Sequence, residues 1–174
     1  MKPAWLTLLL CAAFGAPSWA QSHAATNNKL VEFHRVGDWE IWCLRLENTG
    51  RVECNLNYVL RYKDHPDFRA MIPRVFVRDG KPEMHWGTEW QTDLERGSLA
   101  LGEEEPLRFD NCDKPCVRKG AWLSRLIQFA RSNDEAKLRF YDYIVQEFEE
   151  AIPLIGLRDG VPLLLQLQAR YDGL

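Results

Sequence analysis

The sequence predicts a mostly β protein, either an antiparallel β-sandwich or an open barrel, with one or two short helices. Three observations lead to this class. Short segments rich in β-forming residues recur along the chain, and turn residues separate them. One segment, residues 119–131, has clear helical periodicity. Four cysteines follow the first twenty residues, an even number that is typical of an exported domain held by disulfides.

Residues 1–20 have the three parts of a secretory signal peptide. Lys2 is positively charged, an apolar run extends to Phe14, and small residues precede the cleavage position. The run has about ten residues, fewer than the roughly 20 that cross a bilayer, although an uncleaved anchor is the alternative. We expect cleavage near Ala20, a flexible leader over 21–28, and a single disulfide-stapled domain over 29–174. No transmembrane segment is expected in the mature chain.

Charge is balanced along the chain, with 22 Lys and Arg against 25 Asp and Glu. Charges of both signs are interspersed. Proteins that bind nucleic acid concentrate Lys and Arg on one face, so we expect no nucleic-acid partner.

Residues 39–46 and 52–60 are predicted to form the two strands of a β-hairpin, with the turn centred on residues 48–49. This register places Cys43 directly opposite Cys54. Opposed residues on antiparallel strands lie about 4.5–5.5 Å apart at Cα, within disulfide range. A shift of one residue would turn one cysteine to the other face of the sheet, so the register tests the pairing.

Cys112 and Cys116 flank a turn sequence that contains Pro115, and we expect a second disulfide to close this tight loop. Two alternatives are open. A four-cysteine zinc site needs close spacing in both pairs, and the ten residues between Cys43 and Cys54 break that pattern. A redox-active pair would favour a C-x-x-C motif at a helix start, which the chain lacks. We therefore expect structural disulfides and no metal.

Four more segments ahead of residue 110 are predicted to be strands, because β-forming residues fill them and turn residues separate them. They span residues 70–78, 83–90, 98–101 and 107–109. The first contains Pro73, which lacks a backbone N–H, so an edge strand or a bulge is expected there.

After residue 118 the pattern changes to a helical period over 119–131, which predicts an amphipathic helix. Strands are then predicted over 137–145 and 152–157. The Leu-rich run over 161–169 suits either a helix or a buried strand. A helix is favoured, because Asp159 is a plausible N-terminal cap.

Four motifs occur in a characteristic order along the chain. They are Gly37-Asp38-Trp39 ahead of Cys43, Val52-Glu53-Cys54-Asn55-Leu56, Pro106-Leu107-Arg108-Phe109 ahead of Cys112 and Cys116, and Pro153-Leu154-Ile155-Gly156-Leu157. In this order they resemble the invasion-associated locus B family over nearly the whole mature chain. The resemblance implies a bacterial envelope protein that is periplasmic, associated with the outer membrane or secreted. Some members are linked to host-cell entry. It carries over no catalytic residue, and it implies structural roles for the four cysteines and Gly37-Asp38-Trp39.

Candidate chemistry is sparse. His85 and Glu89 would lie on one face of a predicted strand without a third metal ligand. The acidic cluster of Asp142, Glu147, Glu149 and Glu150 lacks the glycine turn of a calcium loop, so a solvated acidic face is favoured. We expect no catalytic residue and no cofactor. The alternatives are an exported hydrolase built around His65 or His85, and a thiol-disulfide redox protein that uses Cys112 and Cys116.

Residues 62–68 are predicted to form a loop with an aromatic residue at each end. Binding residues are frequent on loops, and exposed aromatic side chains mark partner surfaces. Tyr62, His65 and Phe68 are therefore candidates for contact with a partner. The predicted function is a non-enzymatic binding or accessory role with a protein partner in the cell envelope.

Overall fold

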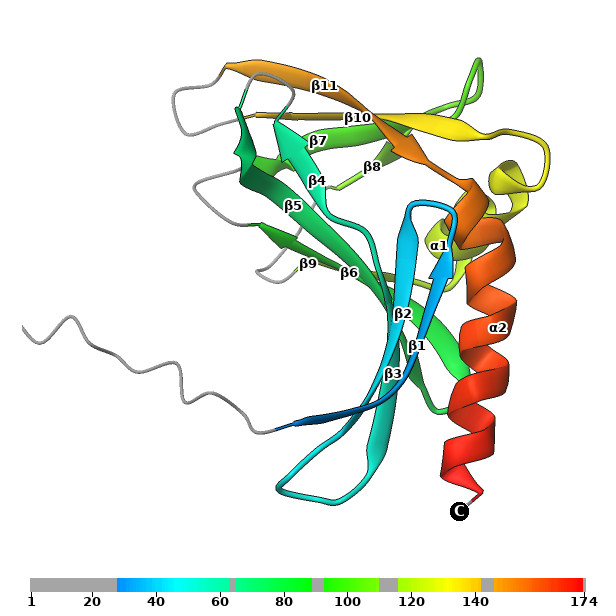
Figure 1. Cartoon of the computed structure of the whole chain (residues 1–174). Helices are drawn as coiled ribbons and strands as arrows, with labels where there is room; N and C mark the ends of the chain where they lie inside the picture. The colour runs from blue at the N-terminus through cyan, green and yellow to red at the C-terminus, as the bar shows by residue number, and fades with distance from the viewer. Residues whose placement is uncertain (1–27, 63–64, 89–92, 110–115, 142–145, 174) are drawn as a thin grey trace, which may run out of the picture.

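Among the residues that it describes, the computed structural model has two antiparallel β-sheets and two helices, which confirms the mostly β class (Figure 1). It describes residues 28–62, 65–88, 93–109, 116–141 and 146–173, and for residues 61–71 and 88 it describes the backbone alone. In this described part of the chain, neither sheet closes into a barrel. No helix among these residues is long and apolar enough to cross a membrane.

The larger sheet, called here the large sheet, has seven strands in the order β1-β2-β3-β5-β6-β9, and β4 also pairs with β5. Their bounds are β1 (Lys29–Val36), β2 (Trp39–Arg45), β3 (Val52–Asn57), β4 (Leu60–Tyr62), β5 (His65–Arg78), β6 (Lys81–Thr88) and β9 (Cys116–Lys119). The small sheet has the order β11-β10-β7-β8, with β7 (Asp93–Ala100), β8 (Leu107–Arg108), β10 (Glu135–Tyr141) and β11 (Glu147–Pro153). The helices are α1 (Ala121–Ala130) and α2 (Ile155–Asp172).

The β2–β3 hairpin has the predicted register. Cys43 lies opposite Cys54, and a disulfide joins them with their Cα atoms 3.9 Å apart. The turn closes through two hydrogen bonds, from Gly50 N to Leu46 O (2.7 Å) and from Leu46 N to Arg51 O (2.8 Å). Gly50 has a positive φ of 68°, a conformation that glycine adopts without steric cost.

Strand alternation in β2 separates a buried face from an open one. Trp39, Ile41 and Cys43 are fully buried, whereas Trp42 between them is 40% exposed. The buried face packs against α2, and the core continues between the two sheets through Val75, Met84, Trp86, Leu99, Phe109, Leu138 and Phe140. Alternation with period two thus fixes which side of the large sheet is covered.

Two glycines allow α2 to lie close to the large sheet (Figure 1). A Cβ atom at Gly156 would lie 2.1 Å from Cδ1 of Trp39. A Cβ at Gly160, one turn further along, would lie 3.0 Å from both terminal methyl carbons of Leu56. Because glycine has no side chain, the helix backbone approaches β2 and β3 directly at these two positions.

The C-terminal region differs from the sequence prediction. A strand was expected over 152–157 and a helix from 161, capped by Asp159, but α2 begins at Ile155 and Asp159 lies within it. Leu154 is the N-cap residue, without a side-chain cap hydrogen bond. The first two turns of α2 contain Gly156, Gly160 and Pro162, which have low intrinsic helix propensity. Local sequence therefore did not indicate that the helix begins at Ile155. With 18 residues α2 is also longer than the short helices expected, whereas α1 matches its prediction.

Pro73 was expected at an edge or a bulge, but it lies in the interior strand β5, between β3–β4 and β6. Its carbonyl accepts a hydrogen bond from Tyr58 N (3.1 Å), so its missing N–H would also face the segment around Tyr58. Residues 58 and 59 separate β3 from β4 there. The proline therefore lies where the neighbouring strand is already interrupted.

Candidate interaction face

The face of the large sheet that points away from α2 is called here the open face. Cross-strand register places Phe33, Trp42, Asn55, Phe76 and Glu83 in one row across β1, β2, β3, β5 and β6. All five are exposed or half-buried. The row is apolar at its β1–β2 end and becomes polar towards β6.

The apolar end forms a compact patch of four side chains, called here the apolar patch: Leu30, Phe33, Trp42 and Leu44. Leu30 is 49% exposed and Phe33 44% exposed, and the Phe33 and Trp42 rings meet edge to face with centroids 6.0 Å apart. The Trp42 indole N–H donates to Glu40 Oε2 at 3.1 Å. Contiguous exposed apolar side chains with polar neighbours are typical of a protein contact surface.

A β-bulge in β1 creates the apolar patch. Leu30 pairs with Leu44 and Glu32 pairs with Cys43, so Val31 is an extra residue on the β1 side. Without it Leu30 and Phe33, three residues apart, would point to opposite faces of the sheet. The bulge therefore aligns both side chains on the open face.

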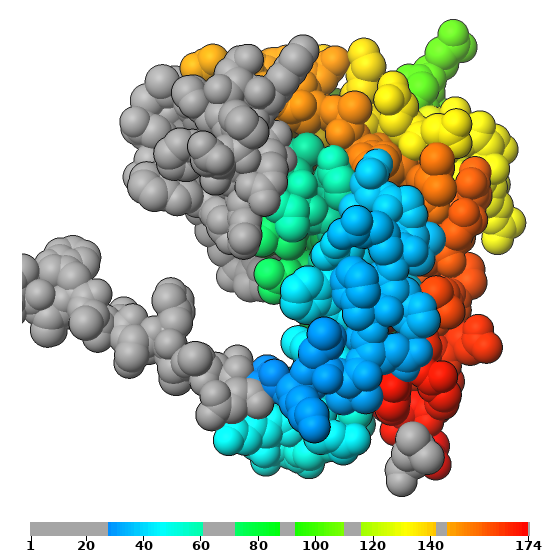
Figure 2. Space-filling model, viewed as in Figure 1, coloured from blue at the N-terminus to red at the C-terminus, as the bar shows by residue number. Residues whose placement is uncertain are grey.

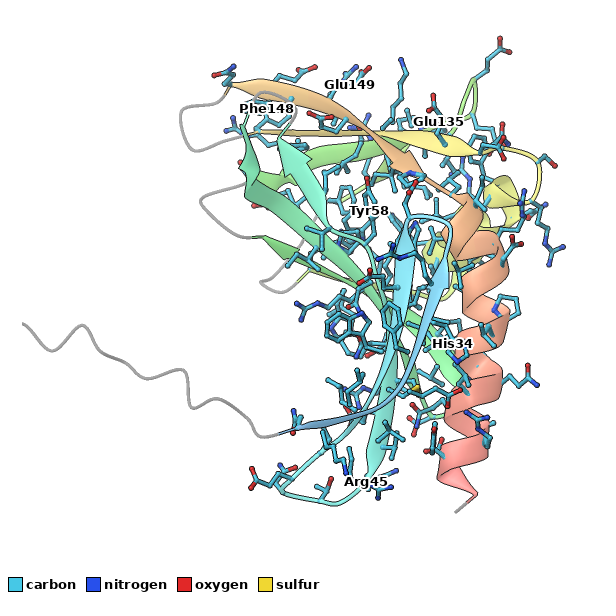
Figure 3. The ribbon with its side chains drawn as sticks, in the orientation of Figure 1. His34, Arg45, Tyr58, Glu135, Phe148 and Glu149 are labelled. Carbon is cyan, nitrogen blue, oxygen red and sulfur yellow. A yellow bond between two sulfur atoms is a disulfide. The ribbon has the colours of Figure 1, made fainter. Side chains whose placement is uncertain are left out.

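Glu32 ties β1 to the end of α2 on the opposite side of the sheet. Its carboxylate accepts hydrogen bonds from the Tyr171 hydroxyl (2.7 Å) and from Arg170, and it lies 2.7 Å from His34 Nε2. The hydrogen bonds from Tyr171 and His34 hold the pKa of the Glu32 carboxyl below its usual value. Figure 3 shows His34 on the side of β1 that faces α2. This network holds the edge strand in place.

The β6 part of the open face carries a histidine–carboxylate pair. His85 Nε2 lies 2.8 Å from Glu83 Oε1, and the Phe76 ring lies 4.7 Å from the imidazole. Arg78 lies over the same Phe76 ring at 5.7 Å and within 3.7 Å of Glu83. The sequence predicts that His85 and Glu89 lie on one face of a strand, but Glu89 lies outside the described residues. The partner in the structure is Glu83, which the period-two spacing on a strand could have indicated.

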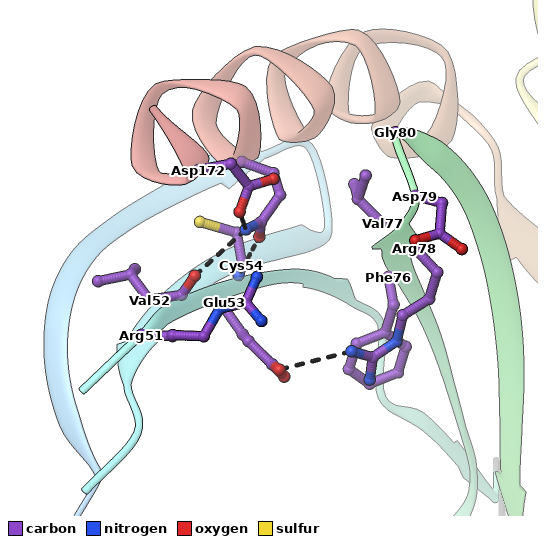
Figure 4. A pocket seen from close by; sticks show the side chains of 11 residues that line it. Arg51, Val52, Glu53, Cys54, Phe76, Val77, Arg78, Asp79, Gly80 and Asp172 are labelled. Carbon is purple, nitrogen blue, oxygen red and sulfur yellow. Dashed lines mark hydrogen bonds and ion pairs between the residues drawn. The ribbon is translucent and has the colours of Figure 1, made fainter. Parts of the chain in front are cut away.

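A polar cavity of about 250 Å³ opens where β3 and β5 diverge (Figure 4). β3 pairs with β5 only from Asn55 to Asn57, so Val52 and Cys54 have no strand partner on that side in the described ladder. The Gln168 side chain fills this role: it accepts from Cys54 N (2.8 Å) and donates to Val52 O (3.2 Å). Gln168 is 7% exposed, and its amide replaces one peptide unit of the missing ladder.

Two of the four motifs that resemble the invasion-associated locus B family meet in the structure. They are Gly37-Asp38-Trp39 and the segment that begins at Pro153. The Trp39 indole N–H donates to Pro153 O at 2.7 Å, and the Trp39 ring stacks on Tyr58 at 5.4 Å. Gly37 has a positive φ of 60°, and a Cβ there would lie 3.6 Å from Ile155. Gly37-Asp38-Trp39 thus packs on the entry to α2, a contact across 114 residues of sequence.

Other sequence candidates are placed in part. Cys116 begins β9 and is disulfide-bonded, but Cys112 lies outside the described residues, so its pairing stays a prediction. The expected loop over 62–68 is wrong for the backbone: Tyr62 ends β4, His65 begins β5, and the two pair in a hairpin. Pairing with β4 outweighs the loop-favouring Pro66 and Asp67. The structure describes only the backbone of Tyr62, His65 and Phe68, so the role of their side chains in binding stays a prediction.

Two members of the acidic cluster, Glu147 and Glu149, form ion pairs with cations across the β10–β11 ladder. Glu149 lies 3.3 Å from Lys137 Nζ, and Glu147 lies 3.0 Å from Arg139 Nε. The Lys137 contacts hold the pKa of the Glu149 carboxyl below its usual value. Asp142 lies outside the described residues. Within the described parts of the chain, no three His, Cys, Asp or Glu side chains gather as a metal site would require.

Comparison with known proteins bears on the fold. No protein-family model and no curated protein sequence matches the chain. A search of solved structures finds similarity to the crystal structure of invasion associated protein B from Bartonella henselae, with a TM-score of 0.56 and 13% sequence identity. The match covers 80% of this chain and 99% of that chain. The chain therefore has the fold of invasion associated protein B.

Proposed function

We propose that this protein is an exported bacterial envelope protein of the invasion-associated locus B type, with a non-enzymatic binding or accessory role towards a protein partner. The signal-like residues 1–20, the Cys43–Cys54 disulfide and the shared fold support export and the family. After cleavage near Ala20 the protein would be periplasmic, associated with the outer membrane or secreted.

The observation that carries the binding role is the apolar patch on the open face. Trp42 and Phe33 are large aromatic side chains held on a rigid sheet, and the charged pair of Arg35 and Glu40 lies beside them. Aromatic anchors with a polar rim are the usual composition of the energetically dominant part of a protein interface. The disulfide beneath Trp42 keeps this part of the sheet rigid, so little order is lost when a partner binds.

The test is site-specific photo-crosslinking in intact cells. A photoreactive aromatic residue replaces Trp42 in one strain and Tyr141, on the exposed side of the small sheet, in a control strain. We expect a discrete crosslinked protein band from position 42 and none of that mass from position 141. Equal crosslinking patterns at the two positions, or no adduct at position 42, would contradict a partner on the open face.

A further inference from the structure

β1 is the end strand of the large sheet, and among the described residues it pairs with β2 alone. In the space-filling view the blue residues of β1 lie on the near surface of the molecule (Figure 2). Natural edge strands of this kind present main-chain hydrogen-bonding groups to any strand that approaches, unless they are blocked by charge, proline or a covering segment.

The hydrogen-bonding direction along β1 follows from Gln168. Cys54 N–H points to Gln168 and not to β2, so Cys43 and Cys54 form a non-hydrogen-bonded pair. The main-chain groups of Cys43 therefore point to β1 and bond Glu32, its partner in the register. Because these directions alternate along a strand, Glu32 and His34 bond β2, whereas the N–H and C=O of Phe33 and Arg35 point to the free edge.

The side chains of Phe33 and Arg35 would complement each other between two copies of the chain related by a two-fold axis. The Phe33 ring is 44% exposed and the Arg35 side chain 69% exposed, and both belong to the open face. If two copies of β1 pair antiparallel about His34, Phe33 of each copy lies opposite Arg35 of the other. A guanidinium against an aromatic ring is attractive, and the pairing closes four main-chain hydrogen bonds.

We propose that the free edge of β1 binds a second copy of this chain, through antiparallel β1 pairing centred on His34. This assembly goes beyond the proposed envelope role. It joins the two large sheets and brings both apolar patches together into one wider face. A contact between two strands is small for a specific interface, so we expect a weak dimer, with a dissociation constant on the order of 10 µM.

The helices leave room for this pairing. α2 lies over β3 at Gly160 and Gln168, which contact Leu56 and Cys54. Its C-terminal end reaches β1, where Arg170 and Tyr171 bond Glu32. The two copies of β3 would be five strand spacings apart, about 24 Å at roughly 4.8 Å each. A helix with its side chains is about 10–12 Å wide, so the parts of α2 that lie over β3 do not collide. The two Glu32 residues, where the α2 ends attach, are four positions apart along the paired strands, about 13 Å at roughly 3.3 Å per residue.

The first measurement is the molecular mass of the purified mature protein by sedimentation equilibrium, from about 1 µM to about 500 µM. We expect a monomer at the low end and a dimer at the high end. Phe33→Lys places a lysine opposite Arg35 of the second copy and should weaken the dimer at least about tenfold. Val117→Lys is the matched control, since Val117 is 38% exposed on β9 at the other end of the sheet order, and it should leave the dimer unchanged.

Amide hydrogen exchange of the wild-type protein tests the same proposal without a variant. Phe33 and Arg35 amides should exchange fast at low protein concentration and become protected at high concentration, whereas Glu32 and His34 amides stay protected at both. A monomer throughout the range, an unaffected Phe33→Lys dimer, or unchanged Phe33 and Arg35 exchange would overturn the proposal. Protection that appears only with another envelope protein would overturn it in favour of a heterologous strand.

Discussion

At the residue scale, Trp39 connects the N-terminal and C-terminal parts of the molecule. Its ring is fully buried between Tyr58 and Gly156, and its indole N–H is satisfied by Pro153 O. The absence of a side chain at position 156 makes this contact possible, since even one methyl group would overlap the ring. Trp39 and Gly156 therefore depend on each other.

Gly156→Ala should destabilise the protein by about 1–3 kcal/mol, because overpacking at Trp39 outweighs the higher helix propensity of alanine. Gly160→Ala is the graded control, since its Cβ meets only the flexible methyl ends of Leu56 at 3.0 Å. Chemical denaturation of both variants measures the difference. A Gly156→Ala protein as stable as Gly160→Ala would show that α2 can shift away from the sheet at no cost.

Glu32 makes part of the stability dependent on pH. Its carboxyl has a pKa below 4.5 in the folded protein, chiefly through the Tyr171 hydroxyl. A depressed carboxyl pKa contributes stability above the unfolded value, and this contribution is lost as pH falls through the folded value. Glu32→Gln should therefore cost about 1 kcal/mol at pH 7 and less as pH falls below 4.5.

Unfolding of the wild type and Glu32→Gln between pH 3 and pH 7 measures this difference. Tyr171→Phe keeps the ring and removes the hydroxyl donor, so its pH dependence below pH 4.5 should be smaller than that of the wild type. A difference in unfolding free energy between wild type and Glu32→Gln that stays constant from pH 3 to pH 7 would contradict a pH-dependent contribution from Glu32.

At the element scale, the relation of α2 to β3 shows how a helix can complete a sheet. β5 leaves β3 at Asn55, and the Gln168 amide then bonds the backbone of Val52 and Cys54. The disulfide at Cys54 and the Gln168 contact lie at the same residue. Helix and sheet edge are thereby joined by polar as well as apolar contacts.

Gln168→Met should destabilise the protein by about 2–3 kcal/mol, because a side chain of similar size leaves a buried N–H and a buried C=O unpaired. Gln128→Met, on the exposed side of α1, is the control and should change stability by less than about 0.5 kcal/mol. Exchange of the Cys54 amide should also become faster. Retained protection of that amide in Gln168→Met would mean that another group replaces the glutamine.

At the scale of the whole molecule, two sheets share one core, and α2 covers one side of the large sheet while the open face carries the apolar patch. Export would remove residues 1–20 and oxidise the cysteines that follow. The envelope form should therefore have a chain start at Gln21 and no free thiol.

Intact mass of protein purified from the envelope, before and after reduction, measures the chain start and the number of bridges. Reduction should add four hydrogens, and peptide mapping should recover Cys43–Cys54 and Cys112–Cys116. A chain that retains Met1, or one with free thiols, would contradict the export assignment.

Local patterns in the sequence were sufficient for the β2–β3 hairpin, the Cys43–Cys54 disulfide, α1 and the mostly β class. Each depends on period, turn residues and spacing within about twenty residues. The same reasoning found neither β1 nor the start of α2. β1 alternates weakly because a bulge interrupts its period, and α2 contains two glycines and a proline that local propensity disfavours in a helix.

Those features are decided by contacts between distant residues. Gly156 is required by Trp39, Gln168 by the unpaired edge of β3, and Glu32 joins β1 to Tyr171. The apolar patch likewise exists because a bulge and a cross-strand register bring Leu30, Phe33 and Trp42 to one face. Sequence alone determined the disulfide-stapled β class, since that information is local. Only the tertiary structure decided where the candidate interaction face lies, because packing between distant segments sets which side chains are left exposed.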